Sequence, residues 1–164
     1  MSVIPPPHWE SELVACGRLV QDEDASVPQE EAERRFNRYV QLVDSVLGTE
    51  GVPGARALVR SMQAAHDYGA YQSTLNKLVF SFPASVVAEA VVTEVPRLII
   101  QLPQWAGEVL NMLVQAQGRS AELVVAFNSA LSRALPEERL AIVHFIREEE
   151  REGWLEHKPG LLAV

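Results

Sequence analysis

Helical periodicity punctuated by prolines constrains the fold of this 164-residue chain more than any other feature of its sequence. Apolar residues recur at steps of three and four, as in Trp9, Leu13 and Cys16, which is the spacing of one face of an α-helix. Prolines stand where helices should begin, since Pro28 and Pro136 are each followed by glutamates in the first turn. The pattern predicts a succession of helices.

The breaks between apolar faces give the expected bounds of these helices. The second should bury Phe36, Tyr39 and Leu47, and glycines after Leu47 should end it. Pro96 should end or kink the helix that Pro83 opens, because an interior proline removes a hydrogen bond and clashes with the preceding turn. We expect helices over residues 9–20, 28–47, 53–67, 68–82, 83–95, 103–117, 120–134 and 136–152, with 98–102 as a short turn or a continuation.

A strand pair is the alternative for three runs rich in β-branched residues: 86–92, 98–100 and 124–125. They lie inside segments with helical starts, and the chain has no Asn-Gly or Asp-Gly hairpin dipeptide. We therefore predict an all-α fold, either an irregular multi-helix bundle or a short HEAT-like array of helical hairpins. One domain should cover 1–164, with extended termini at 1–8 and 153–164.

Charge and composition narrow the class of partner. Fourteen basic and 22 acidic residues give a net charge of −8, which argues against nucleic-acid binding, because that affinity comes mainly from Lys and Arg. The charge suits a basic protein partner, or is simply surface charge. One cysteine permits no intramolecular disulfide. Without a signal peptide or a membrane-spanning apolar stretch in the sequence, we expect a cytoplasmic protein with no membrane contact.

Motifs that carry chemistry are missing from the sequence. The nine glycines are scattered and form no phosphate-binding loop, and one Cys with four His gives no zinc pattern. His144 and Glu148 share a helix face, but no further metal ligand accompanies them. Cys16 lies on an apolar face, where a thiol is usually a small buried side chain. We expect no catalytic site, metal or cofactor.

Two surfaces are candidates for binding a protein. Tyr71 should pack inward, which places Tyr68 and Gln72 on the outer side of their helix with Asn76 one turn further. Exposed tyrosines are favoured at protein interfaces. The second candidate is an acidic run that opposes the dipole at the end of the last helix, made of Glu148, Glu149 and Glu150.

Three stretches have a distinctive pattern: a tyrosine-led helix start, Tyr68-Gly-Ala-Tyr-Gln-Ser-Thr-Leu-Asn-Lys-Leu, a Phe82-Pro83 junction, and a Pro-x-Trp helix start, Leu102-Pro-Gln-Trp-Ala-Gly-Glu-Val-Leu-Asn-Met-Leu. Together they resemble the all-helical immunity proteins of bacterial polymorphic toxin systems. The resemblance covers about residues 60–115. It implies a small acidic cytoplasmic protein that binds and neutralises a cognate toxin domain, and it assigns no functional residue. A helical adaptor or scaffold subunit that binds a protein or peptide remains the alternative, and an enzyme built from Asp, Glu and Tyr residues remains a third.

Overall fold

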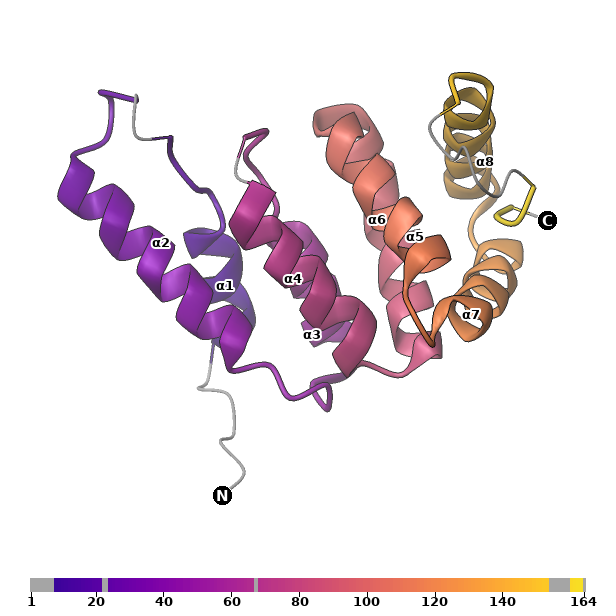
Figure 1. Cartoon of the computed structure of the whole chain (residues 1–164), viewed down its shortest axis with the longest axis horizontal. Helices are drawn as coiled ribbons and strands as arrows, with labels where there is room; N and C mark the ends of the chain where they lie inside the picture. The colour runs from indigo at the N-terminus through magenta and orange to yellow at the C-terminus, as the bar shows by residue number, and fades with distance from the viewer. Residues whose placement is uncertain (1–7, 22–23, 67, 154–159, 164) are drawn as a thin grey trace. The chain divides into compact units, whose positions relative to one another are not determined.

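The computed structural model describes residues 8–21, 24–66, 68–153 and 160–163, and in these the chain is all-α (Figure 1). This confirms the predicted fold class, because the runs considered as strands all lie inside helices. The eight helices of the described residues are α1 (Trp9–Cys16), α2 (Gln29–Asp44), α3 (Gly51–Ser61), α4 (Tyr68–Ser81), α5 (Ala84–Gln101), α6 (Pro103–Gln115), α7 (Ser120–Ser132) and α8 (Pro136–Arg151).

The chain divides into two compact units, Met1–Phe82 and Pro83–Val164. Unit 1 holds α1 to α4 and unit 2 holds α5 to α8, and each is a four-helix bundle. The single domain over 1–164 stays a prediction. No helix in the described part of the chain combines the length and the apolar character needed to cross a membrane.

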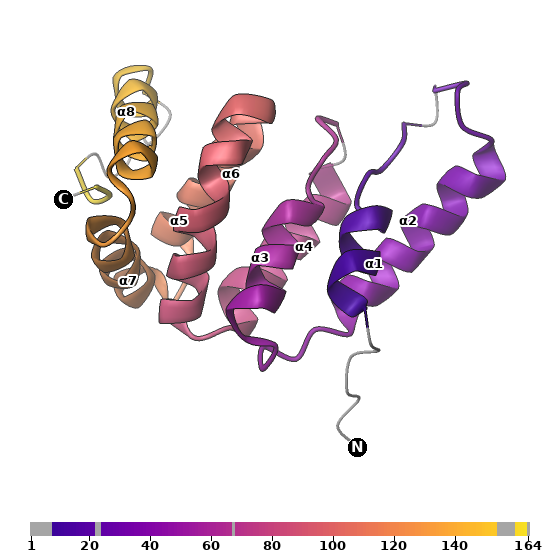
Figure 2. The same cartoon turned by 180° about the vertical axis from the view of Figure 1, so that it is seen from behind.

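Unit 1 consists of two helical hairpins, α1–α2 and α3–α4, that lie side by side. Helix α1 packs on α2 and α3, and α4 packs on α2 and α3. Helices α2 and α4 form the layer nearer the viewer in Figure 1, and Figure 2 shows α1 and α3 from the other side. Two stacked hairpins are what a HEAT-like array would show at its smallest, so within unit 1 both predicted packings describe the same arrangement.

Two buried tyrosines tie the helices of unit 1 together, and their rings meet edge to face with centroids 6.1 Å apart. The Tyr39 hydroxyl lies 2.9 Å from Ser61 Oγ and 2.6 Å from Thr74 Oγ1. The Tyr71 hydroxyl donates to the Gly17 carbonyl over 2.6 Å, so α4 holds the end of α1. These contacts pair the buried polar groups inside an otherwise apolar core.

Helix α1 ends at Cys16, four residues before the predicted end at Val20. Gly17 follows, and a Cβ placed on it would lie 2.1 Å from the Ser61 carbonyl oxygen, so the chain passes too close to α3 for any side chain. Helix α3 also ends early, at Ser61, because the main-chain N–H groups of Gln63 and Ala64 donate to the Tyr71 hydroxyl and do not continue the helix.

The buried face of α2 differs from the prediction at its two ends. Tyr39 is buried as expected, but Phe36 is 40% exposed. The helix ends at Asp44, before the predicted end at Leu47, and Leu47 is 50% exposed. Phe36 is exposed because α1 is short. Trp9 Nε1 donates to the Leu42 carbonyl, so α1 covers the C-terminal half of α2 and stops before it reaches the N-terminal half.

Unit 2 is built around α5, which packs against α6, α7 and α8. Pro96 was predicted to end or kink this helix. It does not end the helix, since α5 continues to Gln101. The proline costs one main-chain hydrogen bond, and the packing of α5 on three neighbours holds the helix together across that gap. The core of this unit includes Trp105, Leu113 and Phe127, each at most 1% exposed.

The predicted extended termini lie mostly outside the described residues. Residues 160–163 are described, and they fold back onto unit 2 with Leu162 only 1% exposed. Asn128 holds them, since its side chain donates to the Leu161 carbonyl and accepts the Ala163 N–H.

Candidate functional site

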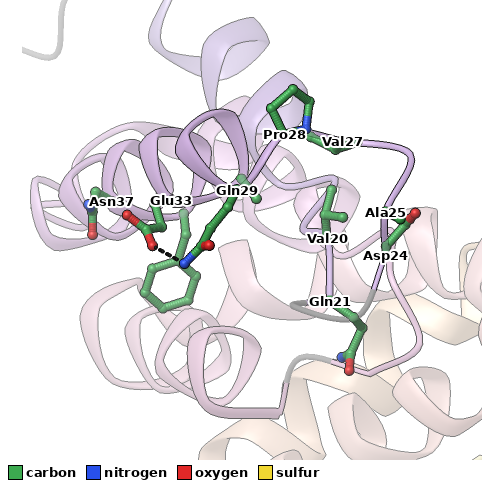
Figure 3. Close-up of a pocket in the computed structure, with 11 residues that line it drawn as sticks. Val20, Gln21, Asp24, Ala25, Val27, Pro28, Gln29, Glu33 and Asn37 are labelled. Carbon is green, nitrogen blue, oxygen red and sulfur yellow. Dashed lines mark hydrogen bonds between the residues drawn. The ribbon is translucent and has the colours of Figure 1, made fainter.

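A concave pocket of about 740 Å³ lies in unit 1 between the N-terminal half of α2 and the segment before it (Figure 3). Helix α1 ends at Cys16, and the described residues between α1 and α2 that line the pocket belong to no helix. The described residues that line it are Val20, Gln21, Asp24, Ala25, Val27, Pro28, Gln29, Ala32, Glu33, Phe36 and Asn37.

The wall of the pocket combines polar and apolar side chains, and its charge is negative. Phe36 contributes an aromatic ring to the lining, and Val20 and Val27 contribute aliphatic side chains. Among the described residues that line the pocket, the charged ones are Asp24 and Glu33, both acidic. An aromatic ring beside carboxylates suits a Lys or Arg side chain, whose stem packs on the ring while its head group meets the carboxylate.

Both carboxylates are held in place by neighbours in the chain. The Ser26 main-chain N–H donates to Asp24 Oδ1 over 2.9 Å, and hydrogen bonds from Ser26 lower the pKa of Asp24. Gln29 Nε2 donates to Glu33 Oε1 over 2.9 Å, the dashed line in Figure 3. The bond from Gln29 leaves Glu33 Oε2 unused, and Asp24 stays ionised at neutral pH because the bonds from Ser26 lower its pKa. The pocket therefore keeps its negative charge under ordinary conditions.

The predicted residues of α4 are exposed, as their spacing indicated. Tyr68 is 53% exposed, Gln72 and Asn76 are exposed, and Phe80 continues the stripe at 49% exposure. Steps of four residues place them along one side of α4. Helix α4 lies beside α2 in the same layer of unit 1, so the stripe and the pocket belong to one unit (Figure 1).

The predicted acidic run lies in unit 2, where its three carboxylates have different surroundings. Glu148 forms an ion pair with Arg151. Glu150 accepts from Arg147 over 2.9 Å and from the Gly160 N–H over 2.8 Å, and its side chain is only 11% exposed. Burial, together with the charge of Glu152, raises the pKa of Glu149. Much of this run serves internal contacts, which favours the first candidate surface over the second.

The sequence offered Cys16 and His144 as side chains that could carry chemistry. Cys16 is half-buried, and burial raises the pKa of its thiol, with the Glu12 charge adding to the effect. A raised pKa keeps the thiol protonated and a poor nucleophile. His144 is exposed on α8. In the described residues no three His, Cys, Asp or Glu side chains gather as metal ligands would.

The pocket was not predicted from the sequence. Gly17 is the signal that could have shown it, since a glycine directly after Cys16 marks a possible helix end and would have left Phe36 uncovered. Comparisons of the chain with protein-family models, with curated proteins and with solved structures find no match.

Proposed function

We propose that this protein is an immunity-type inhibitor that binds a cognate toxin domain and neutralises it without catalysing a reaction. The pocket of unit 1 is the observation that carries the proposal. It joins an exposed aromatic side chain, Phe36, to two carboxylates, Asp24 and Glu33, in an acidic chain. Apolar anchors rimmed by charge are the usual composition of an energetic centre in a protein interface.

A basic surface of the toxin domain is the partner that this chemistry fits. A Lys or Arg side chain inserted between Phe36 and the carboxylates would give up water around its charged head group. The carboxylates of Asp24 and Glu33 would compensate for that loss by binding the head group. The net charge of −8 would also draw a basic domain toward the chain and raise the rate of association. Tyr68 and the stripe on α4 add contact area in the same unit.

A helical adaptor that binds a protein partner is the second candidate. The side-by-side hairpins of unit 1 favour it, because stacked hairpins are the building blocks of adaptors with extended binding surfaces. Both candidates use a protein interface and differ in whether the partner is toxic.

Growth rescue tests the proposal. Each open reading frame beside the gene is expressed alone to find one that stops growth, and this chain is then co-expressed with it. We expect growth to return and the two proteins to elute together in a one-to-one complex. If the product of a neighbouring gene forms the complex but does not stop growth, the protein is an adaptor and not an inhibitor. If the chain relieves toxicity without binding, a binding function is excluded.

Variants then locate the interface. Phe36→Ala and the pair Asp24→Asn with Glu33→Gln should both reduce rescue while the melting temperature stays near that of the wild type. The matched control is Glu89→Gln with Glu137→Gln, which removes two exposed charges from unit 2 and should leave rescue unchanged. The loss of rescue in Tyr68→Ala measures how much the exposed stripe on α4 contributes to binding. If the control pair reduces rescue as much as the pocket pair, net charge matters and the pocket does not.

A further inference from the structure

Residues 160–163 lie beside α7 and α8 of unit 2 (Figure 1). Polar side chains of both helices bind the main chain of this segment. Asn128 of α7 donates to the Leu161 carbonyl over 2.9 Å and accepts the Ala163 N–H over 2.8 Å. Arg147 of α8 donates to the Ala163 carbonyl over 3.0 Å and lies 3.5 Å from that of Leu162. Glu150 accepts the Gly160 N–H. We call these three side chains, Asn128, Arg147 and Glu150, the α7–α8 cradle.

Every one of these contacts is made to main-chain atoms of the segment. The cradle therefore binds main-chain N–H and C=O groups, which all peptides possess. Two of its side chains also hold each other, since Arg147 Nη1 donates to Glu150 Oε2 over 2.9 Å. A binding site whose polar groups are already oriented loses less entropy when its ligand arrives.

The sequence of the segment matters at two positions. Leu162 is 1% exposed, while its neighbour Leu161 is 38% exposed, so one leucine enters the unit and the other stays outside. Gly160 has φ +80°, a conformation that glycine adopts without strain. The resident segment thus has the pattern Gly-x-Leu in a bent conformation, with its main chain held from two helices.

Burial of a leucine alone would not need this cradle. A side chain that merely completes a core requires only an apolar space, whereas here three polar side chains from α7 and α8 are aimed at five main-chain groups of four consecutive residues. Main-chain recognition combined with one side-chain pocket is how proteins bind short segments of other proteins.

We propose that the α7–α8 cradle is a peptide-binding site that takes a bent Gly-x-Leu segment from a partner protein, with residues 160–163 as its resident occupant. The resident segment belongs to the same chain, so it competes at a high effective concentration, in the millimolar range for short tethers. A partner segment enters when the resident one leaves. The site is separate from the pocket of unit 1, and it stands or falls independently of the proposed inhibition.

The test uses the full chain and a dye-labelled peptide with the sequence of residues 160–164, Gly-Leu-Leu-Ala-Val. Leu162→Asp prevents the resident segment from seating. We expect this variant to bind the peptide at least about tenfold more tightly than the wild type, whose own segment competes. The peptide should also raise the melting temperature of the variant, because a ligand of the folded state stabilises it.

Two second-site changes identify the cradle. Adding Asn128→Ala to the Leu162→Asp chain removes two hydrogen bonds and should weaken peptide binding by about tenfold or more. Adding Asn111→Ala instead, at a half-buried asparagine of α6 in the same unit, should leave binding unchanged. A peptide carrying Asp in place of its second leucine should not bind.

Three outcomes would overturn the proposal. One is a folded Leu162→Asp chain that does not bind the peptide, and another is equal binding to the Asn128→Ala and Asn111→Ala forms. The third is loss of helical structure in both Leu162→Asp and the milder Leu162→Ala, because the segment would then be part of the core and not an exchangeable ligand. A wild-type dimer that the peptide dissociates would support the site, with a second copy supplying the segment.

Discussion

Replacement of Tyr71 by Phe should destabilise unit 1 far more than the same change at Tyr39. Both variants keep the aromatic ring, so the edge-to-face contact between the two rings at 6.1 Å is preserved and only a hydroxyl is lost. Both side chains are fully buried. The two positions differ in what the hydroxyl leaves behind.

The Tyr71 hydroxyl serves three main-chain groups: it donates to the Gly17 carbonyl and accepts the N–H groups of Gln63 and Ala64. An unsatisfied buried polar group costs about 1–3 kcal/mol, and the two N–H groups are only partly buried. We therefore expect Tyr71→Phe to lower the free energy of unfolding by about 3 kcal/mol.

The partners of Tyr39 keep other hydrogen bonds. Ser61 Oγ also donates to the Leu58 carbonyl, and Thr74 Oγ1 also donates to the Ala70 carbonyl. Loss of the Tyr39 hydroxyl leaves both of these satisfied, so Tyr39→Phe should cost about 1 kcal/mol. Urea denaturation followed by circular dichroism measures both values. Equal losses, or a Tyr71→Phe loss under about 1 kcal/mol, would refute the reasoning that the Tyr71 hydroxyl fixes the ends of α1 and α3.

Three further predictions concern the backbone, the charges and the domain organisation. Gly17→Ala should cost more than about 2 kcal/mol by overpacking against Ser61, whereas Gly118→Ala, with φ +77° and open space around its Cβ, should cost about 1 kcal/mol; a reversed order in urea denaturation would contradict this. Burial raises the pKa of Glu149 in the folded chain, so its ionised form opposes folding at neutral pH. Glu149→Gln should therefore stabilise the chain at pH 7, and this gain in stability should vanish as the pH falls below the ordinary glutamate pKa. A gain that is independent of pH in thermal melts would contradict this. Calorimetry should show one cooperative transition, as for a single domain, and two separate transitions would show that residues 1–82 and 83–164 fold independently.

The sequence predicts the fold well where the signal is local. Prolines followed by glutamates mark the starts of α2 and α8, and apolar spacing places Leu113 and Phe127 in the core. The errors arise where tertiary contacts decide. Pro96 lies inside α5, which packs against three helices, and such tertiary contacts cannot be read from local sequence.

The candidate site illustrates the same limit. The exposure of Tyr68, Gln72 and Asn76 follows from helical phase once Tyr71 is placed inward. The pocket depends on the length of α1, which a close approach between Gly17 and Ser61 determines across 44 residues of sequence. Contacts of that range set which half of α2 stays uncovered, so periodicity alone placed Phe36 in the core.

Salt dependence of association is the most direct test of the central claim, that an acidic pocket in unit 1 captures a basic protein. The rate constant for association with the partner found by growth rescue is measured by stopped flow at low and at high salt. We expect the wild-type rate to fall by about tenfold or more as salt rises. The dependence of the association rate on salt should weaken for Asp24→Asn with Glu33→Gln. It should stay unchanged for Glu89→Gln with Glu137→Gln. A rate that ignores salt, or equal slopes for the two pairs, would contradict the claim.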